Sequence, residues 1–288
     1  MVLVMGRPGG GELGAVVGVL REWQREGAVA QLHPGDVGWF WRFGAEAVGG
    51  AVRVWRRGGR VLAVGLLDGE RLLRLATAPE VRRDEAVARR LAEDLSRPER
   101  GVLGEGRACV EAPGDALVQE LLAEEGWGTD EPWTPLRREL GEPVEEPGVR
   151  IEVTGPGRAH VRAAVQRAAF DNSTFTEARW RAMAAGPPYD DARCLVAHDE
   201  RGAAVAAVTV WSAGPGRPGL LEPMGVHREH RGRGFGRAIA LAAAAALRDL
   251  GASSAFVCTP SAHRAAVATY VSAGFRPLPE VRDRRRDG

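Results

Sequence analysis

The two halves of the sequence repeat one order of signals, and this repetition constrains the fold more than any other feature. The first half contains Cys109-Val-Glu-Ala-Pro, then a helical stretch and then Gly126-Trp127. The second half repeats this order with Cys258-Thr-Pro, a helical stretch and Gly274-Phe275. The offset is 149 residues at the cysteines and 148 at the aromatic residues, and Ala78-Pro-Glu-Val-Arg82 lies 149 residues before His227-Arg-Glu-His-Arg231. A nearly constant offset indicates an internal duplication, so two copies of one fold are expected.

A proline-, glycine- and acid-rich segment near the midpoint separates the two copies. This segment, Gly141-Glu-Pro-Val-Glu-Glu-Pro-Gly148, is the best linker candidate in the chain. A length of 288 residues also fits two domains rather than one. We therefore expect a first domain over residues 1–140 and a second over residues 149–288.

Helical and β-rich patterns follow the same order in both halves. Helical periodicity covers Glu12 to Glu26, Asp84 to Leu95, Asp115 to Glu125, Arg158 to Phe170, Glu177 to Ala185, Gly236 to Leu250 and Ala262 to Ala273. β-Rich runs cover Met1 to Met5, Val52 to Trp55, Arg60 to Leu67, Leu72 to Ala76, Cys194 to His198, Ala204 to Trp211, Leu220 to Val226 and Ser254 to Cys258. The turns Asp68-Gly69 and Glu200-Arg-Gly202 predict hairpins. The fold class is thus α+β, a mixed sheet with flanking helices. The tail Arg282 to Asp287 is so charged that we expect it to be solvated and disordered.

Composition excludes several classes of function. Thirty-nine basic and thirty-eight acidic residues leave a formal charge of +1, which argues against nucleic acid or an anionic membrane as partner. Every basic residue is arginine, so a Walker A loop and a Schiff-base lysine are excluded. Three widely spaced cysteines suggest neither disulfides nor a zinc cluster, and a cytoplasmic location is expected. His227 and His230 lack the spacing of a metal motif, and no metal site is expected.

The segment Arg231-Gly-Arg-Gly-Phe-Gly236 is the most informative in the chain. It follows a strand that ends near Val226 and opens an alanine-rich helix. Glycines allow a tight turn, and the amides at a helix N-terminus form a site for a pyrophosphate. The alternative is a tight strand-to-helix connection that binds nothing. A dinucleotide fold is disfavoured, because Arg237 stands where its glycine motif needs a third small residue.

Together with Tyr270-Val-Ser-Ala-Gly-Phe275 about forty residues later, this segment resembles the GNAT superfamily of N-acetyltransferases. The resemblance covers residues 149 to 279, and the whole chain is similar to tandem GNAT proteins whose first copy is degenerate. It implies two tandem GNAT-like domains and acetyl-CoA as co-substrate. The acceptor it implies is an amine of a small molecule or a peptide.

The resemblance also implies roles for individual residues. The pyrophosphate would be held by Arg231, Gly232, Arg233, Gly234, Phe235 and Gly236, with Arg237 nearby. Met224, Gly225 and Val226 would pair with the pantetheine arm through their backbones, and one of their amides would polarise the thioester carbonyl. Tyr270 matches the tyrosine that protonates the departing thiolate, the alternative being a packed helix residue. His263 stands where many members carry an asparagine that contacts the cofactor, and its imidazole can donate a hydrogen bond from the same place.

An amine acceptor must lose a proton before it attacks, and Glu222 is the candidate base. It lies two residues before Met224 on the same strand, so alternation predicts that both side chains share one face. The alternative is an edge-strand glutamate paired with an arginine. The aromatic residues Phe175, Trp180, Tyr189 and Trp211 are expected to form core rather than an acceptor wall.

The first half keeps the scaffold but not the site. The common offset places Arg83, Glu85 and Val87 where the second half has Gly232, Gly234 and Gly236, and this copy is expected to be structural. Two hypotheses follow. The first is an N-acetyltransferase that transfers an acetyl group to a primary amine by direct attack in a ternary complex. The second is a non-catalytic CoA-binding module or partner subunit. In either case the chain is expected to be a monomer or a homodimer without nucleic-acid or membrane partners.

Overall fold

The computed structural model describes residues 2–288, which form two compact units. The first unit comprises the chain up to His33, Ala45–Trp133 and Val281–Gly288, and the second comprises Pro34–Gly44 and Thr134–Glu280. Each unit thus includes a short segment from the other half of the chain. These units differ from the expected continuous ranges 1–140 and 149–288, while the structural and catalytic roles assigned to the two ranges remain predictions.

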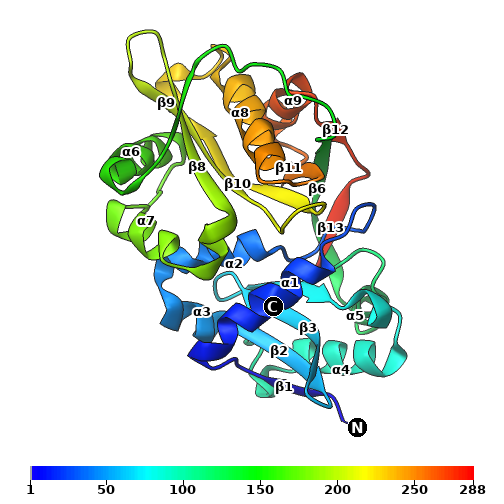
Figure 1. Ribbon diagram of the computed structural model, residues 1–288. Helices are drawn as coiled ribbons and strands as arrows, with labels where there is room; N and C mark the ends of the chain where they lie inside the picture. Colours follow the sequence, from blue (N-terminus) through cyan, green and yellow to red (C-terminus); the bar gives the residue numbers. More distant parts are fainter. Residues whose placement is uncertain (1) are drawn as a thin grey trace. The chain divides into compact units, whose positions relative to one another are not determined.

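The first unit contains a mixed sheet with the strand order β1-β2-β3-β4-β5-β13-β6. Its strands are β1 (Val4–Gly6), β2 (Val52–Arg57), β3 (Arg60–Leu67), β4 (Leu72–Thr77), β5 (Ala108–Glu111), β13 (Val281–Arg286) and the first part of β6 (Gly128–Glu139). Its helices are α1 (Leu13–Trp23), α3 (Ala45–Ala51), α4 (Glu85–Ser96) and α5 (Leu117–Glu124) (Figure 1). Strands β1 to β4 are antiparallel neighbours, and β5 runs parallel to β4.

The second unit repeats this plan with the strand order β6-β11-β10-β9-β8-β7, and β12 pairs with the last part of β6. Its strands are β7 (Arg150–Val153), β8 (Ala192–His198), β9 (Ala204–Trp211), β10 (Pro218–Val226), β11 (Ser254–Pro260) and β12 (Arg276–Pro277). Its helices are α2 (Pro34–Phe40), α6 (Ala159–Ala169), α7 (Glu177–Ala184), α8 (Phe235–Asp249) and α9 (Arg264–Ser272). Both units have the same order of elements: three antiparallel strands, a helix, a strand that pairs in parallel with the third strand, and a second helix. The predicted duplication is therefore confirmed.

The core of the second unit lies on both faces of its sheet. Leu195, Ala197 and Leu221 pack with α8 residues such as Ile239 on one face. Cys194 and Leu220 pack with Trp180 of α7 on the other. Figure 1 shows α8 and α9 as neighbours, and α6 beside α7. Adjacent residues of one strand therefore belong to different cores, as the period of two requires.

Most of the predicted elements form within two or three residues of the expected bounds, and both expected hairpins are antiparallel pairs. The first strand begins at Val4, and Met1 lies outside the described residues. The prediction for the tail was wrong, because Val281–Arg286 forms strand β13 between β5 and β6. Its arginines find partners there: Arg282 donates to the carbonyl of Asp130 and Arg284 to Oε1 of Gln119. Hydrogen-bonded neighbours thus order a segment whose composition alone indicates disorder.

Candidate active site

Strand β10 leaves β11 partway along its length and thereby opens an edge of the sheet. Within residues 2–288, β10 pairs with the parallel strand β11 only over Pro218–Leu220. On its other side β10 stays paired with β9 through Val226, after a register shift between Leu221 and Met224. The backbone from Met224 to Val226 therefore has β9 on one side and no β11 partner on the other.

The backbone groups of Met224 and Val226 face this open edge. The amide of His227 donates to the carbonyl of Val205 at 2.8 Å, which makes these two residues a hydrogen-bonded pair. Because such pairs alternate along an antiparallel ladder, Gly225 bonds its partner Ala207, and the N–H groups of Met224 and Val226 point away from β9. An extended ligand with amide groups could bind along this edge, because backbone N–H and C=O groups are exposed there at the spacing of a β-strand.

A glycine-rich loop leads from this edge to the N-terminus of α8. Gly232 and Gly234 have φ angles of 74° and 85°, and Gly234 is the residue that precedes the first helical turn. Ala238 makes the first bond of the helix, to the carbonyl of Gly234. The amides of the preceding residues have no partner within the helix, and the dipole adds partial positive charge. The loop thus presents amides for an anionic group beside the open edge.

The arginines of this loop have different surroundings. Arg231 donates to the carbonyl of Ala169 at 2.7 Å and so holds the loop against the C-terminus of α6. Arg237 donates to the carbonyl of Ser272 at 2.9 Å, at the end of α9. The exposed side chain of Arg233 has no hydrogen bond or ion pair to any described residue. Of the three, Arg233 is thus the guanidinium most available to a ligand, while Arg231 and Arg237 also anchor helices.

Helix α9 approaches α8 closely at the glycine that ends the loop. A Cβ atom built on Gly236 would lie 2.8 Å from Cγ2 of Thr269 and 3.6 Å from Cγ2 of Val226. Any larger residue there would require the side chain of Thr269 to move. This approach brings Tyr270, the next residue of α9, to the side of the sheet on which Met224 and Val226 pack.

The phenol of Tyr270 is a buried proton donor. Its side chain is 6% exposed and packs edge-on against the ring of Phe275, with centroids 5.7 Å apart. Burial raises the pKa of Tyr270 above its ordinary value, and the negative charge of Glu222 raises it further. Both effects disfavour the phenolate, so Tyr270 keeps its proton at neutral pH.

Glu222 lies at the irregular part of β10, and the structure places it within electrostatic reach of Tyr270. The register shift between Leu221 and Met224 interrupts the alternation of side chains across Glu222. Simple alternation therefore does not establish that Glu222 and Met224 share a face, and that prediction stays open. The backbone carbonyl of Glu222 accepts a hydrogen bond from the indole of Trp211 at 2.6 Å.

The remaining predicted residues lie around the loop. His263 precedes the first turn of α9, where its amide donates to the carbonyl of Pro260 and its ring makes no capping hydrogen bond. His227 and His230 pack edge-on with ring centroids 5.2 Å apart. Residues 2–288 contain no group of three or more histidines, cysteines or acids arranged to hold a metal ion.

The corresponding place in the first unit carries the opposite charge. The residue before α4 is Asp84, whose carboxylate accepts from the amide of Val87 at 2.9 Å. That backbone hydrogen bond is the main reason why the pKa of Asp84 is lowered. An ionised carboxylate occupies the helix N-terminus and would repel a phosphate. That this copy lacks the site stays a prediction.

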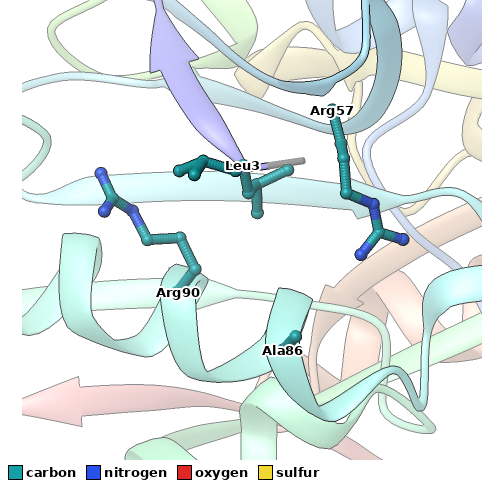
Figure 2. Close-up of a pocket in the computed structure, with 5 residues that line it drawn as sticks. Leu3, Arg57, Ala86 and Arg90 are labelled. Carbon is teal, nitrogen blue, oxygen red and sulfur yellow. The ribbon is translucent and has the colours of Figure 1, made fainter.

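A pocket of about 250 Å³ also lies in the first unit. Figure 2 shows Arg57 and Arg90 on either side of Leu3, with Ala86 on the same helix as Arg90. Arg57 is paired with Asp84 at 3.3 Å and Arg90 with Asp94 at 2.9 Å. Because both guanidinium groups already have carboxylate partners, the pocket offers no unpaired charge to an anion.

Sequence reasoning missed the contacts that support the site from outside it. The side chain of Thr269 on α9 packs against the backbone of Gly236, and the indole N–H of Trp211 donates to the carbonyl of Glu222. Trp211 was expected only as a core residue. No motif marks either contact, because each joins residues from separate elements.

Comparisons with known proteins agree with this geometry. The acetyltransferase (GNAT) family model matches residues 162–275, the part of the second unit that holds the open edge and the loop. A search of curated proteins found no match. The solved structures that resemble the chain include a tandem GNAT protein from the clavulanic acid biosynthesis pathway. It has a TM-score of 0.61 and 17% identity, and the match covers 99% of this chain and 98% of that one.

Two further structures match over nearly the whole chain. A GCN5-related N-acetyltransferase from Sphaerobacter thermophilus has a TM-score of 0.59 and 17% identity, with coverage of 99% of this chain and 95% of that one. A GNAT-family acetyltransferase from Colwellia psychrerythraea has a TM-score of 0.60 and 14% identity, with coverage of 99% of both chains. At these identities the likeness establishes the fold.

The fold is that of GNAT acetyltransferases, and the family match lies within its second unit. The fold of the whole chain is that of a tandem GNAT protein. None of the helices formed by residues 2–288 has the length and apolar character that a membrane span requires.

Proposed function

We propose that the second unit binds acetyl-CoA and transfers its acetyl group to a primary amine of a small molecule or a peptide. The observation that carries this proposal is the open edge of β10, which leads directly into the amides at the N-terminus of α8. The pyrophosphate lies on the loop Arg231–Gly236, with Arg233 as an additional cation. The pantetheine arm pairs with Met224 to Val226 along the open edge.

The acyl transfer follows by direct attack in a ternary complex. The acceptor arrives as an ammonium, and Glu222 takes its proton directly or through water. The free amine attacks the thioester carbonyl, which an outward-facing amide of β10 polarises. As the new C–N bond forms, the C–S bond breaks, and the CoA thiolate takes the proton of Tyr270. The nitrogen gives up its second proton in the same step; this proton returns through water to the Tyr270 phenolate, and the proton held by Glu222 is released to solvent. The buried phenol suits this role because it is protonated at neutral pH.

Binding and turnover need separate measurements. Calorimetry with acetyl-CoA tests the cofactor site, and thiol release over a panel of amines and peptides, with mass spectrometry of the products, tests the transfer. We expect micromolar-range binding and thiol release that depends on one class of amine. Tight binding with no release for any amine would favour the non-catalytic CoA-binding module. Absence of binding would refute both hypotheses.

A further inference from the structure

The backbone at Glu222 is held by a tryptophan from the neighbouring strand. The indole N–H of Trp211 on β9 donates to the carbonyl of Glu222 at 2.6 Å, and Trp211 is 1% exposed. The bond falls within the register shift between Leu221 and Met224, where the regular ladder of β9 and β10 is interrupted. A side-chain donor therefore fixes the backbone where the ladder is irregular.

The position of this indole is set by a helix from the first half of the chain. A Cβ atom built on Gly38 of α2 would lie 2.4 Å from Cζ3 of Trp211 and 2.7 Å from Cε3. The backbone of α2 thus lies directly on the indole ring. On another side the ring of Tyr189 packs edge-on against Trp211 at 6.1 Å.

Helix α2 is fixed within the second unit by Trp39 and by Trp41, which directly follows the helix. The segment Pro34–Gly44 belongs to this unit although the chain on both sides of it belongs to the first. Trp39 packs on Phe175 with ring centroids 5.2 Å apart. Trp41 covers Gly186 so closely that a Cβ atom there would lie 2.5 Å from Cγ of the indole. These contacts hold Gly38 against Trp211.

We infer that Trp211 is a positioning residue for Glu222 and that Gly38 fixes the indole through which it acts. This inference rests on the proposed function, since it assumes that Glu222 is the base. It gives the first half of the chain a part in the reaction, because α2 supports the residue that holds the backbone of Glu222. Neither Trp211 nor Gly38 contacts the reacting atoms in this account.

The chain offers a matched control for the indole N–H. Trp180 lies in the same aromatic cluster and is 3% exposed, but its N–H has no hydrogen-bond partner among the described residues. Trp211→Phe and Trp180→Phe therefore both remove a buried indole, and only the first removes a hydrogen bond. We expect kcat to fall about tenfold in Trp211→Phe and to stay within about twofold in Trp180→Phe, at unchanged acetyl-CoA affinity.

A double-mutant cycle tests whether Trp211 acts through Glu222. In the Glu222→Gln background, Trp211→Phe should cause no further loss of kcat, because the base it positions is gone. Losses that multiply would show that Trp211 acts independently and would overturn the inference. If Glu222→Gln alone left kcat and its pH profile unchanged, the proposed base would fail instead, so the two failures are distinguishable.

Gly38→Ala tests the inference without removing an aromatic ring. The new methyl group must displace the indole of Trp211, so we expect reduced kcat with retained acetyl-CoA affinity and a folded chain by thermal unfolding. Gly18→Ala in α1 is the control, because a Cβ atom there meets nothing within 4 Å. Equal kcat in Gly38→Ala and Gly18→Ala, or equal kcat in the two tryptophan variants, would overturn the inference.

Discussion

Tyr270 on α9 lies within electrostatic reach of Glu222 on β10, and the carboxylate raises the pKa of the phenol. Burial raises the pKa of the phenol, and the carboxylate charge raises it further. Both effects keep a proton on Tyr270, the proposed donor, next to the carboxylate that we propose as the base. One protonated donor and one ionised acceptor are what amine acetylation needs, since one proton must be removed and another supplied.

The pH dependence of Glu222→Gln follows from the acceptor's own ionisation. At neutral pH an amine is mostly protonated, so losing the base should lower kcat. In alkali the amine deprotonates unaided, and the deficit should shrink. The pH–rate profile of the variant is compared with that of Glu200→Gln, a change in the exposed turn between β8 and β9. A deficit that is constant across pH would leave Glu222 a structural residue.

Gly234→Glu should abolish acetyl-CoA binding. Gly234 has a φ of 85° and open space at its Cβ position, so the change adds backbone strain and places a carboxylate beside the pyrophosphate amides. Gly202→Glu is the matched control, with a φ of 81° and equally open space in the turn between β8 and β9. Calorimetry should show binding for the control alone. Unchanged binding in folded Gly234→Glu would mean that the loop is only a turn.

The chain should bind one acetyl-CoA per molecule. In the second unit the residue before the helix is Gly234, whereas in the first it is Asp84, ionised and bonded to the amide of Val87. The two helix N-termini therefore present opposite charges to a phosphate. The stoichiometry from calorimetry should be one. A stoichiometry of two equivalent sites would show that the first unit also binds acetyl-CoA.

The repeated core of each unit was predictable because its signals are local. Strands β3 and β9 were predicted with their observed bounds, since alternating apolar runs end at turns such as Asp68-Gly69. Helix α2 was not predicted. It has only seven residues, including a proline and two glycines, and forms where its aromatic side chains find partners in the second unit. Its contacts, rather than its propensity, determine it.

The parts of the site that belong to a sequence motif were predictable. The side-chain orientations and hydrogen bonds that depend on tertiary contacts were not. The glycine loop was predicted from its residues, and Tyr270 from the family resemblance. The loop leads from the open edge of β10 to α8, and Tyr270 packs in the same core as Met224 and Val226. The orientation of Glu222 was argued from alternation, which the register shift interrupts. The bond of Arg231 to Ala169 joins residues far apart in sequence and leaves no trace in the motif.

Asp283 should make the first unit less stable as the pH rises. Burial raises its pKa from the usual 3.8 to about 7; Glu111 and Asp130 act in the same direction, and Arg74 opposes them. Below about pH 4 both the folded and the unfolded chain are protonated at this group. Between about pH 4 and 7 the unfolded chain loses its proton first, so the free energy of unfolding falls, and above about pH 7 the loss is complete.

Asp283→Asn removes this titration. The Tm of the variant relative to wild type should rise between pH 4 and 7 and level off above. Asp287→Asn is the control, because Asp287 lies just after the same strand with its side chain 73% exposed. Parallel Tm curves for wild type and Asp283→Asn would show that Asp283 titrates in its ordinary range.

Tyr270→Phe tests the proton donor. The ring stays in place against Phe275, so folding and acetyl-CoA affinity should be retained while kcat falls by about 10²-fold, the effect of losing a general acid. The rate of the variant should also depend more steeply on the pKa of the leaving thiol, because the thiolate now departs without a proton. Tyr189→Phe, at the only other tyrosine of the chain, controls for loss of a hydroxyl elsewhere. Weakened acetyl-CoA binding with an unaltered kcat would mean that the Tyr270 hydroxyl anchors the cofactor, and the catalytic role would be withdrawn.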